Sequence, residues 1–329
     1  MAEQTKSRRV KDFVFLYLKG MAMGAADVVP GVSGGTIAFI TGIYEELLDT
    51  IKGFNLSILK SLRHDGIKST WQKTNATFLA VLFAGIFTSV ISLAKGITFL
   101  LETYPVLLWA FFFGLIVASS VIIAKFIKKW SLNAIVSLLA GAAIAYYVTI
   151  AAPSQIPDGL IYIFLAGCIA ICAMILPGIS GSFILLLLGA YATVLGSISG
   201  LVDGLKATDS EMIISFGTNL TVFAFGCLIG IIAFSNFLSW MFKKAYSMTM
   251  ALLTGFMIGS LNKVWPWKET IETRINSHGE EVPFLQSNIS PMRFEELYGE
   301  PAQLWLAVAL CVVGFAVVFI MEKMAAQKG

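Results

Sequence analysis

Two short stretches combine polar residues and glycines inside apolar sequence, and chemistry is most expected there. The first, DVVPGVSGGTIAFITGIYEEL, covers residues 27–47, and the second, LPGISGSFILLLLGAYATVL, covers residues 176–195. Proline lacks a backbone N–H and disfavours a helical conformation in the residue before it, so Pro30 and Pro177 should each end a helix. Each stretch therefore predicts a helix that breaks and then restarts.

The restart of each broken helix supplies hydrogen-bond donors for an anion. Glycines allow an irregular turn, and a serine or threonine can cap the new helix. The first N–H groups of a helix lack helical partners and carry partial positive charge, so phosphate is a natural ligand. A turn that only lets helices pack closely is the alternative. The residues expected to bind phosphate are Gly31, Ser33, Gly34, Gly35 and Thr36 in the first stretch, and Gly178, Ser180, Gly181 and Ser182 in the second.

Three acidic residues and one lysine lie in or beside the first stretch. An acid such as Asp27 costs about 2.5–3.5 kcal/mol at the centre of a membrane helix, and such acids are functional by default. We expect Asp27 to exchange a proton or hold a sodium ion, or else to accept the N–H bonds of the turn itself. Glu45 and Glu46 are expected near the inner surface, in a solvated or a gating role. Lys19 is expected to reach the inner lipid headgroups or to pair with phosphate.

The cysteines and histidines argue against several classes of site. All four cysteines lie in apolar sequence, and the only histidines, His64 and His278, lie in polar stretches. Their spacing does not fit metal ligands, so neither a zinc site, a haem nor a Ser–His catalytic pair is expected. The sequence predicts no catalytic residue, no metal and no cofactor beyond a coupling proton or sodium ion.

The composition indicates a polytopic membrane protein. The chain has 329 residues, of which 57% are hydrophobic and 13% charged, whereas a soluble domain has about 25% charged residues. Several apolar blocks approach the ~20 residues that span a bilayer, and no removable signal peptide is expected. Two broken segments, at about 13–51 and 159–199, are re-entrant hairpins or tight pairs of short spans. Six strong spans are expected at about 76–94, 104–125, 132–152, 214–241, 246–264 and 303–322.

The distribution of charge indicates the orientation. With the N-terminus inside, most of the 23 basic residues fall on the inner side, as the positive-inside rule requires. We therefore expect a multi-pass protein of the cytoplasmic (inner) membrane with both termini in the cytoplasm. The basic segment 52–75 is expected to form an amphipathic loop on the inner leaflet. The outer segment 265–302 is expected to form a partly ordered cap without assigned chemistry.

The two stretches align at an offset of 147 residues, which places Gly42 opposite Gly189. Three spans follow each hairpin, and because three is odd the second hairpin would enter the membrane from the opposite face. The fold class expected is an all-α polytopic membrane protein with two inverted-topology repeats, each a re-entrant (broken) helical hairpin followed by three transmembrane helices. Residues 1–152 would form the first repeat and residues 153–329 the second. Secondary transporters use this plan, and chance recurrence of a common turn is the alternative.

The stretch MGAADVVPGVSGGTIAFITGIYEEL, together with LPGISGSFILLLLGAYATVL, resembles the DUF368 domain family of bacteria and archaea, also called PopT-like. The resemblance covers nearly the whole chain and implies a transporter rather than an enzyme. It implies a flippase that returns undecaprenyl phosphate, or a related polyprenyl phosphate, from the outer to the inner leaflet. That lipid is the carrier for peptidoglycan and other envelope glycans. The implied partners are this lipid and membrane lipids, with no nucleic acid.

Two other functions remain open. Integral undecaprenyl-pyrophosphate phosphatases also have inverted hairpins with a PG-x-S turn, but an arginine follows the serine where this chain has Gly34 and Gly181. All five arginines lie in polar stretches, and a phosphoryl transition state is difficult to stabilise without a nearby cation. A small-anion secondary transporter is the other alternative, and it would have a sealed cup rather than a lateral opening to the bilayer.

Overall fold

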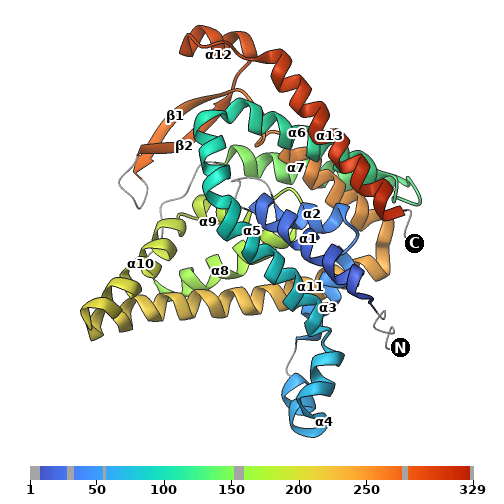
Figure 1. Ribbon diagram of the computed structural model, residues 1–329, viewed down its shortest axis with the longest axis vertical. Coiled ribbons are helices and arrows are strands. Elements are labelled where there is room, and N and C mark those ends of the chain that lie inside the picture. Colours follow the sequence, from blue (N-terminus) through green and yellow to red (C-terminus); the bar gives the residue numbers. More distant parts are fainter. Residues whose placement is uncertain (1–7, 28–32, 55–56, 152–158, 276–280, 327–329) are drawn as a thin grey trace.

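The computed structural model describes residues 8–27, 33–54, 57–151, 159–275 and 281–326 of the chain (Figure 1). Pro30 and Gly31 lie outside the described residues. The elements before residue 160 are α1 (Val10–Asp27), α2 (Gly34–Ile40), α3 (Tyr44–Gly53), α4 (Ser57–Lys73), α5 (Ala76–Thr103), α6 (Pro105–Ala124) and α7 (Leu132–Ile150). The later ones are α8 (Leu160–Ile175), α9 (Gly181–Leu187), α10 (Tyr191–Ala207), α11 (Ser210–Ser260), β1 (Lys268–Ile275), β2 (Glu281–Asn288), α12 (Pro291–Tyr298) and α13 (Leu304–Ala326).

Four helices in the described part of the chain are long and apolar enough to cross a membrane: α5, α6, α7 and α11. The pair α9 and α10, bent by 106°, would make a fifth span if it crosses as one unit. Helix α11 has 51 residues, about 76 Å of helix at 1.5 Å per residue, which is far longer than a bilayer is thick. It bends at Ala245, whose backbone is not helical (φ −145°, ψ 55°). The bend divides α11 into a first arm, residues 210–244, and a second arm, residues 246–260, where the sequence predicted two separate spans.

Close glycine contacts join the helices in pairs. A methyl group added at one glycine of each pair would lie 1.9–2.3 Å from a backbone oxygen of the partner helix. Small residues of this kind let membrane helices approach closely and gain van der Waals contact. The pairs are α1 with α5 (Gly20), α6 with α13 (Gly114), α7 with the second arm of α11 (Gly255) and α8 with the first arm of α11 (Gly226).

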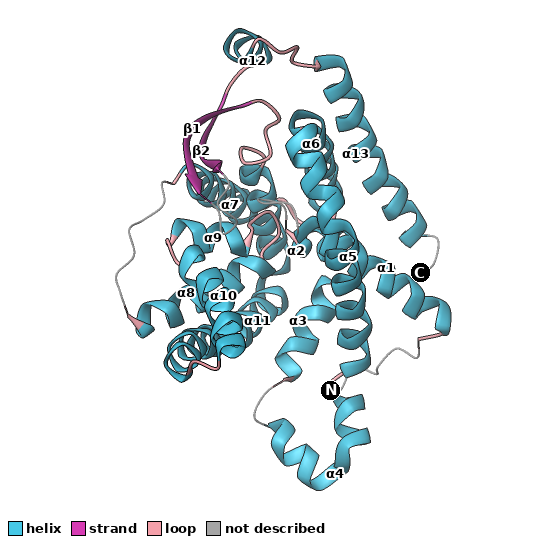
Figure 2. Ribbon diagram, turned by 60° about the vertical axis from the view of Figure 1, so that its left-hand side comes forward, coloured by secondary structure: helices cyan, strands magenta, loops and turns pink. Residues whose placement is uncertain are grey.

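Two polar parts of the chain lie at opposite ends of the molecule: α4 at one end, and β1, β2 and α12 at the other (Figures 1 and 2). Helix α4 projects from one end and contains a non-helical residue, Gly66 (φ 76°). At the other end β1 and β2 pair antiparallel, with Lys268 opposite Asn288, and α12 follows them. The indole N–H of Trp267 donates to Ala302 O (2.9 Å), which attaches this end to the start of α13. Apart from β1 and β2 the described elements are helical, and the expectation of an all-α chain missed this hairpin.

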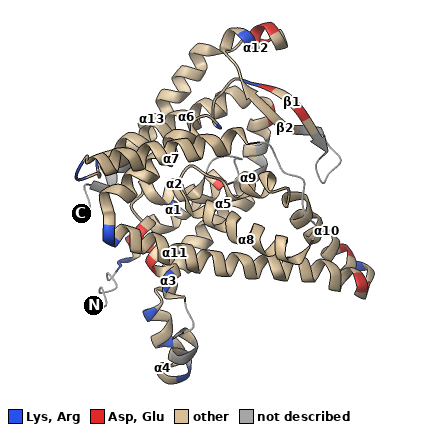
Figure 3. Cartoon of the chain, turned by 180° about the vertical axis from the view of Figure 1, so that it is seen from behind, with Lys and Arg blue, Asp and Glu red and all other residues tan. Residues whose placement is uncertain are grey.

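The charges follow the same division. Figure 3 shows Lys and Arg on α4, whereas Asp and Glu are found on β1, on α12 and near the turn between α10 and α11. Between these two ends the core is apolar, and its fully buried side chains include Tyr44, Phe78 and Leu253. The two breaks predicted from the sequence lie beside this core.

Candidate functional site

The first break is organised by the carboxylate of Asp27, the last residue of α1. Asp27 Oδ1 accepts a hydrogen bond from the Gly34 N–H (2.7 Å), which is the first amide of α2. Ser33 has an extended backbone (φ −120°, ψ 130°), and its Oγ accepts a bond from the Gly35 N–H (3.1 Å). These two side chains satisfy amides that have no helical partner. Asp27 thus accepts one N–H bond of the turn, as the second of its two expected roles requires, and its role in ion coupling stays a prediction.

The Asp27 carboxylate packs directly against Gly34. A Cβ atom there would lie 2.5 Å from Asp27 Oδ2 and 2.9 Å from Asp27 Cγ. Nonbonded heavy atoms do not approach so closely, so a larger residue would displace the carboxylate. The short sequence from Asp27 to Gly34 therefore specifies one carboxylate position.

The second break lacks an equivalent carboxylate. Pro177 is buried, and Gly178 has φ +87°, a conformation that favours glycine. The hydroxyls of Ser180 and Ser182 lie 2.9 Å apart, and the Ser180 side chain does not cap α9. The first turn of α9 therefore has no side-chain cap of the kind that Ser33 gives α2. Ser182 is exposed.

The two breaks meet, although about 140 residues of sequence separate them. Ser33 Oγ lies within hydrogen-bond distance of Met174 O (3.3 Å) and Leu176 O (3.2 Å) at the C-terminal end of α8. The Gly178 N–H donates to Thr36 Oγ1 (2.9 Å). The Tyr44 hydroxyl donates to Ile175 O (3.1 Å). Groups of the first break thus satisfy backbone groups that the end of α8 leaves without helical partners.

These contacts leave few of the expected phosphate donors accessible. The residues Ser33, Thr36 and Ser180 have 1%, 0% and 7% of their surface exposed. Gly34 and Gly35 are buried as well, and a Cβ at Gly35 would lie 2.6 Å from Ile175 O. The structure brings together the described residues of both sets, but in this conformation it closes them against one another. Of the expected hydroxyl donors, Ser182 is the exposed one.

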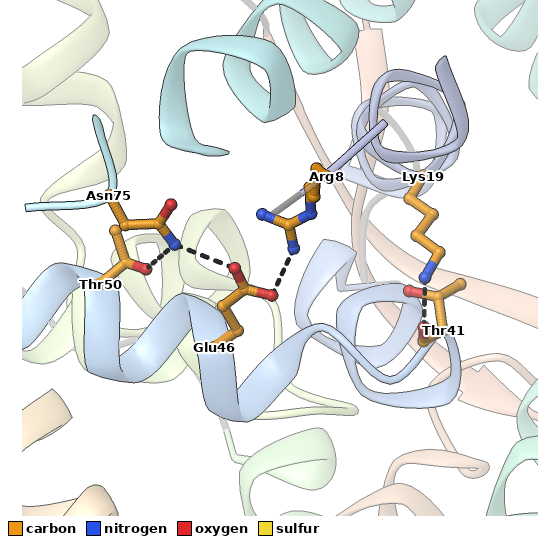
Figure 4. Close-up of polar contacts among 6 residues, drawn as sticks. All are labelled: Arg8, Lys19, Thr41, Glu46, Thr50 and Asn75. Carbon is orange, nitrogen blue, oxygen red and sulfur yellow. Dashed lines mark hydrogen bonds and ion pairs between the residues drawn. The ribbon is translucent and has the colours of Figure 1, made fainter. Parts of the chain in front are cut away.

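Lys19 and Glu46 lie in separate polar contacts beside the breaks (Figure 4). The Lys19 ammonium donates to Thr41 O (2.7 Å) at the C-terminal end of α2, where a cation interacts favourably with the helix dipole. The Glu46 carboxylate pairs with the Arg8 guanidinium (2.5 Å) and accepts a bond from Asn75 Nδ2 (2.9 Å). Glu46 on α3 therefore contacts Arg8, which precedes α1, and Asn75, which precedes α5. The bond from Lys19 to Thr41 is a structural contact that neither of the expected roles of Lys19 included.

Glu45 lies at a small cavity of about 90 Å³ between α3 and the first arm of α11. Asp49 and Lys243 also line this cavity, and Asp49 Oδ1 accepts a bond from the Ser239 hydroxyl (2.9 Å). Both acids of the predicted gating pair thus belong to the polar surface of α3. None of their hydrogen bonds described above reaches the two breaks.

The sequence analysis missed a larger cavity, of about 420 Å³, at the β-hairpin end of the molecule. The end of α7, residues 262–268 and the two strands enclose it. Two lysines, Lys263 and Lys268, line it. The pattern KVWPWK at 263–268, two cations flanking two tryptophans, was a signal for this site, but the segment was assigned no chemistry.

The surroundings of these two ammonium groups lower their pKa values. Lys263 Nζ lies 4.2 Å from the centre of the Phe183 ring, and Lys268 Nζ lies 4.1 Å from that of Trp109. Burial lowers the pKa of Lys263 to about 8. Burial, and next the charge of Lys263, lower the pKa of Lys268 well below its usual range. A cation removed from water in this way is stabilised by an anionic partner.

The chain is similar to proteins that carry a functional name. Residues 23–282 match the model of a family described as "VCA0040-like: Undecaprenyl phosphate translocase-like". A protein of Vibrio cholerae serotype O1 named "Polyprenyl-phosphate transporter" is 47% identical over 317 residues, which cover 96% of this chain and 98% of that protein. A Staphylococcus aureus protein of the same name is 33% identical over 261 residues, covering 76% of this chain and 85% of the relative. No solved structure matches the chain.

Proposed function

Because this chain belongs to the VCA0040-like family of undecaprenyl phosphate translocase-like proteins, we propose that it moves a polyprenyl phosphate between the leaflets of the membrane. The observation that carries this proposal is the 47% identity to a polyprenyl-phosphate transporter over almost the whole of both chains. The family is one of multi-pass membrane transporters and not of enzymes, so the phosphatase alternative is not supported. The lipid expected is undecaprenyl phosphate, and the direction expected is from the outer to the inner leaflet.

The proposed architecture is a pair of inverted repeats. Gly42 and Gly189, which are equivalent under the offset of 147 residues, have φ angles of 71° and 73°. The packed helix pairs also correspond between the halves. The pair of α1 and α5 in the first half corresponds to the pair of α8 and the first arm of α11 in the second. The pair of α6 and α13 corresponds to the pair of α7 and the second arm of α11, and each of these pairs joins the two halves. Both similarities support equivalent folding of the two halves.

A pair of asparagine contacts supports the same repeat. Asn75 Nδ2 donates to Thr50 Oγ1 (3.3 Å) between α5 and α3. Asn219 Nδ2 donates to Ser197 Oγ (3.4 Å) between α11 and α10. Since Thr50 and Ser197 are separated by 147 residues, the two asparagines reach equivalent hydroxyls.

The proposed orientation places α4 in the cytoplasm and the β-hairpin outside. The positive-inside rule supports it, because α4 is basic and the hairpin end is acidic (Figure 3). Two lysines near the bend at Ala245 agree with this orientation, which places both on the inner side. Lys128 lies over the Tyr246 ring (5.0 Å), and Lys244 lies over the Trp240 ring (4.9 Å). Both termini would then lie in the cytoplasm.

The proposed path of the phosphate lies between the two breaks. The prenyl tail can stay in lipid while the charged headgroup crosses a polar path, since a bare phosphate in hydrocarbon would be prohibitively unfavourable. In the conformation described here Ser33 and Thr36 hold the breaks together, so they would contact the phosphate only after the breaks separate. Asp27 would couple this separation to a proton or a sodium ion.

The test is a flipping assay in proteoliposomes of the purified full-length protein. We expect faster leaflet exchange of a fluorescent polyprenyl phosphate than in empty liposomes, with no phosphate released from the matching polyprenyl pyrophosphate. Equal exchange with and without protein would refute the transport proposal. Release of inorganic phosphate would restore the phosphatase alternative.

A further inference from the structure

The cavity at the β-hairpin end collects positive charge without collecting negative charge. Its lining includes Lys263 and Lys268, and no acidic residue is among the described residues that line it. Within the described part of the chain, neither ammonium group makes a salt bridge to a carboxylate. Lys268 Nζ instead donates to the backbone oxygen of Lys263 (2.5 Å), which joins one lysine side chain to the loop that carries the other.

We propose that this cavity is a capture site for a phosphate monoester, which Lys263 and Lys268 hold at the outer face before it reaches the breaks. The inference rests on the proposed transport of a polyprenyl phosphate. A lysine ammonium is a common ligand of phosphate, and charge-assisted hydrogen bonds of this type are roughly twice as strong as neutral ones. An anion here would also favour the charged forms of both lysines, which burial disfavours.

The other polar side chains of the cavity are largely committed to one another. Asn262 Nδ2 donates to Thr149 Oγ1 (2.8 Å), and Asn288 Nδ2 donates to Asn262 O (2.7 Å). These bonds connect the loop after α11 to α7 and to β2, so they fix the walls of the cavity. Lys263 and Lys268 are then the charged hydrogen-bond donors among the described residues that line the cavity.

The cavity also connects to the second break. The Lys263 ammonium lies over Phe183, which belongs to the first turn of α9 and follows the exposed Ser182 directly. A cation–π contact of this kind holds the ammonium in place but leaves its N–H groups able to reach an anion. A phosphate held by Lys263 would therefore lie next to the break that has no carboxylate of its own.

The test uses labelling of lysines in the unaltered protein in nanodiscs. An amine-reactive reagent is applied at pH 8 with polyprenyl phosphate, with polyprenol or with inorganic phosphate, and the modified lysines are quantified by mass spectrometry. We expect polyprenyl phosphate to slow labelling of Lys263 at least fivefold and polyprenol to have no effect. Lys206, an exposed lysine that pairs with Asp203, should react equally in every arm.

Unchanged labelling of Lys263 at a lipid concentration that saturates binding would overturn the inference. Protection by inorganic phosphate at the same concentration as by the lipid would show a site for free phosphate and would overturn its assignment to the transported lipid.

A variant separates this inference from the transport proposal. Lys263→Gln should weaken binding of polyprenyl phosphate at least tenfold, Lys263→Arg should restore most of it, and Lys206→Gln should leave it unchanged. If the wild type transports and Lys263→Gln binds and transports equally well, the capture site is wrong although the transport proposal stands. If the wild type binds the lipid without exchanging it between leaflets, the transport proposal fails while the site is retained.

Discussion

The contact between Asp27 and Gly34 gives a sharp test of how the first break is built. In Gly34→Ala the new methyl group would lie 2.5 Å from Asp27 Oδ2, so the carboxylate must move and its hydrogen bond to the residue 34 amide is lost. A hydrogen bond to a charged group contributes about 1.5–3 kcal/mol, and the clash itself is relieved when the carboxylate turns aside. We therefore expect a loss of about 1.5–3 kcal/mol in the free energy of unfolding.

This loss is measurable as a fall in thermal stability. At about 2 °C for each kcal/mol in a chain of this size, the unfolding midpoint should fall by about 3–6 °C. The assay is thermal unfolding of the purified protein in detergent, followed by tryptophan fluorescence. Gly196→Ala is the matched control, because its Cβ would meet no atom within 4 Å and alanine favours a helix by about 1 kcal/mol over glycine.

A double-mutant cycle identifies the cause of the loss. In Asp27→Ala the carboxylate is absent, so a methyl group at position 34 has no carboxylate to displace, and adding Gly34→Ala should cost little. Asp27→Asn keeps the size of the side chain and should leave the two effects close to additive. If Gly34→Ala destabilises the Asp27→Ala protein as much as the wild type, the clash with the carboxylate is not the cause and the reasoning fails.

The remaining predictions concern transport and pH. Asp27→Asn should abolish the dependence of flipping on pH or sodium in proteoliposomes; unchanged dependence would make Asp27 structural only. Ser33→Ala should lower both the unfolding midpoint and the flipping rate, since it removes a hydroxyl that bridges the breaks and is expected to meet the phosphate. The folded protein binds fewer protons than the unfolded chain between pH 8 and 10.5, because burial lowers the pKa of Lys263 to about 8 from 10.5. Stability relative to Lys263→Gln should therefore rise with pH across that window, and a flat difference in thermal unfolding would contradict this.

The sequence predicted the location of the breaks well, because their causes are local. Proline and glycine act through the backbone of their own neighbours, and Ser33 caps the helix that begins one residue later. The partners of Ser33 at Met174 and Leu176 were beyond such reasoning, because they depend on how the halves pack. The offset of 147 residues indicated that the two breaks are equivalent and did not indicate which atoms would touch.

The outer segment shows a different reason for failure. Strand β1 contains Thr270, Ile271 and Thr273, β-branched residues that favour a strand. The segment was expected to form a partly ordered cap, and these residues were not interpreted as a strand. The pattern KVWPWK marked the two lysines of the cavity but not its walls, because these come from α7, the loop after α11 and the hairpin.

Ser33→Ala is informative because the two roles of the hydroxyl predict opposite effects on transport. The breaks are held together by the Ser33 and Tyr44 hydroxyls and the Gly178 amide, and at about 1 kcal/mol for each hydrogen bond the closed form gains about 3 kcal/mol. An open form disfavoured by that amount would be populated at about 1%. If the hydroxyl only bridges, its loss lowers the gap by about 1 kcal/mol and raises the open population and the flipping rate about fivefold. If it binds the phosphate in the open form, the loss of that contact outweighs the gain and the rate falls. A rise in flipping would therefore assign Ser33 to closure and remove it from the phosphate site.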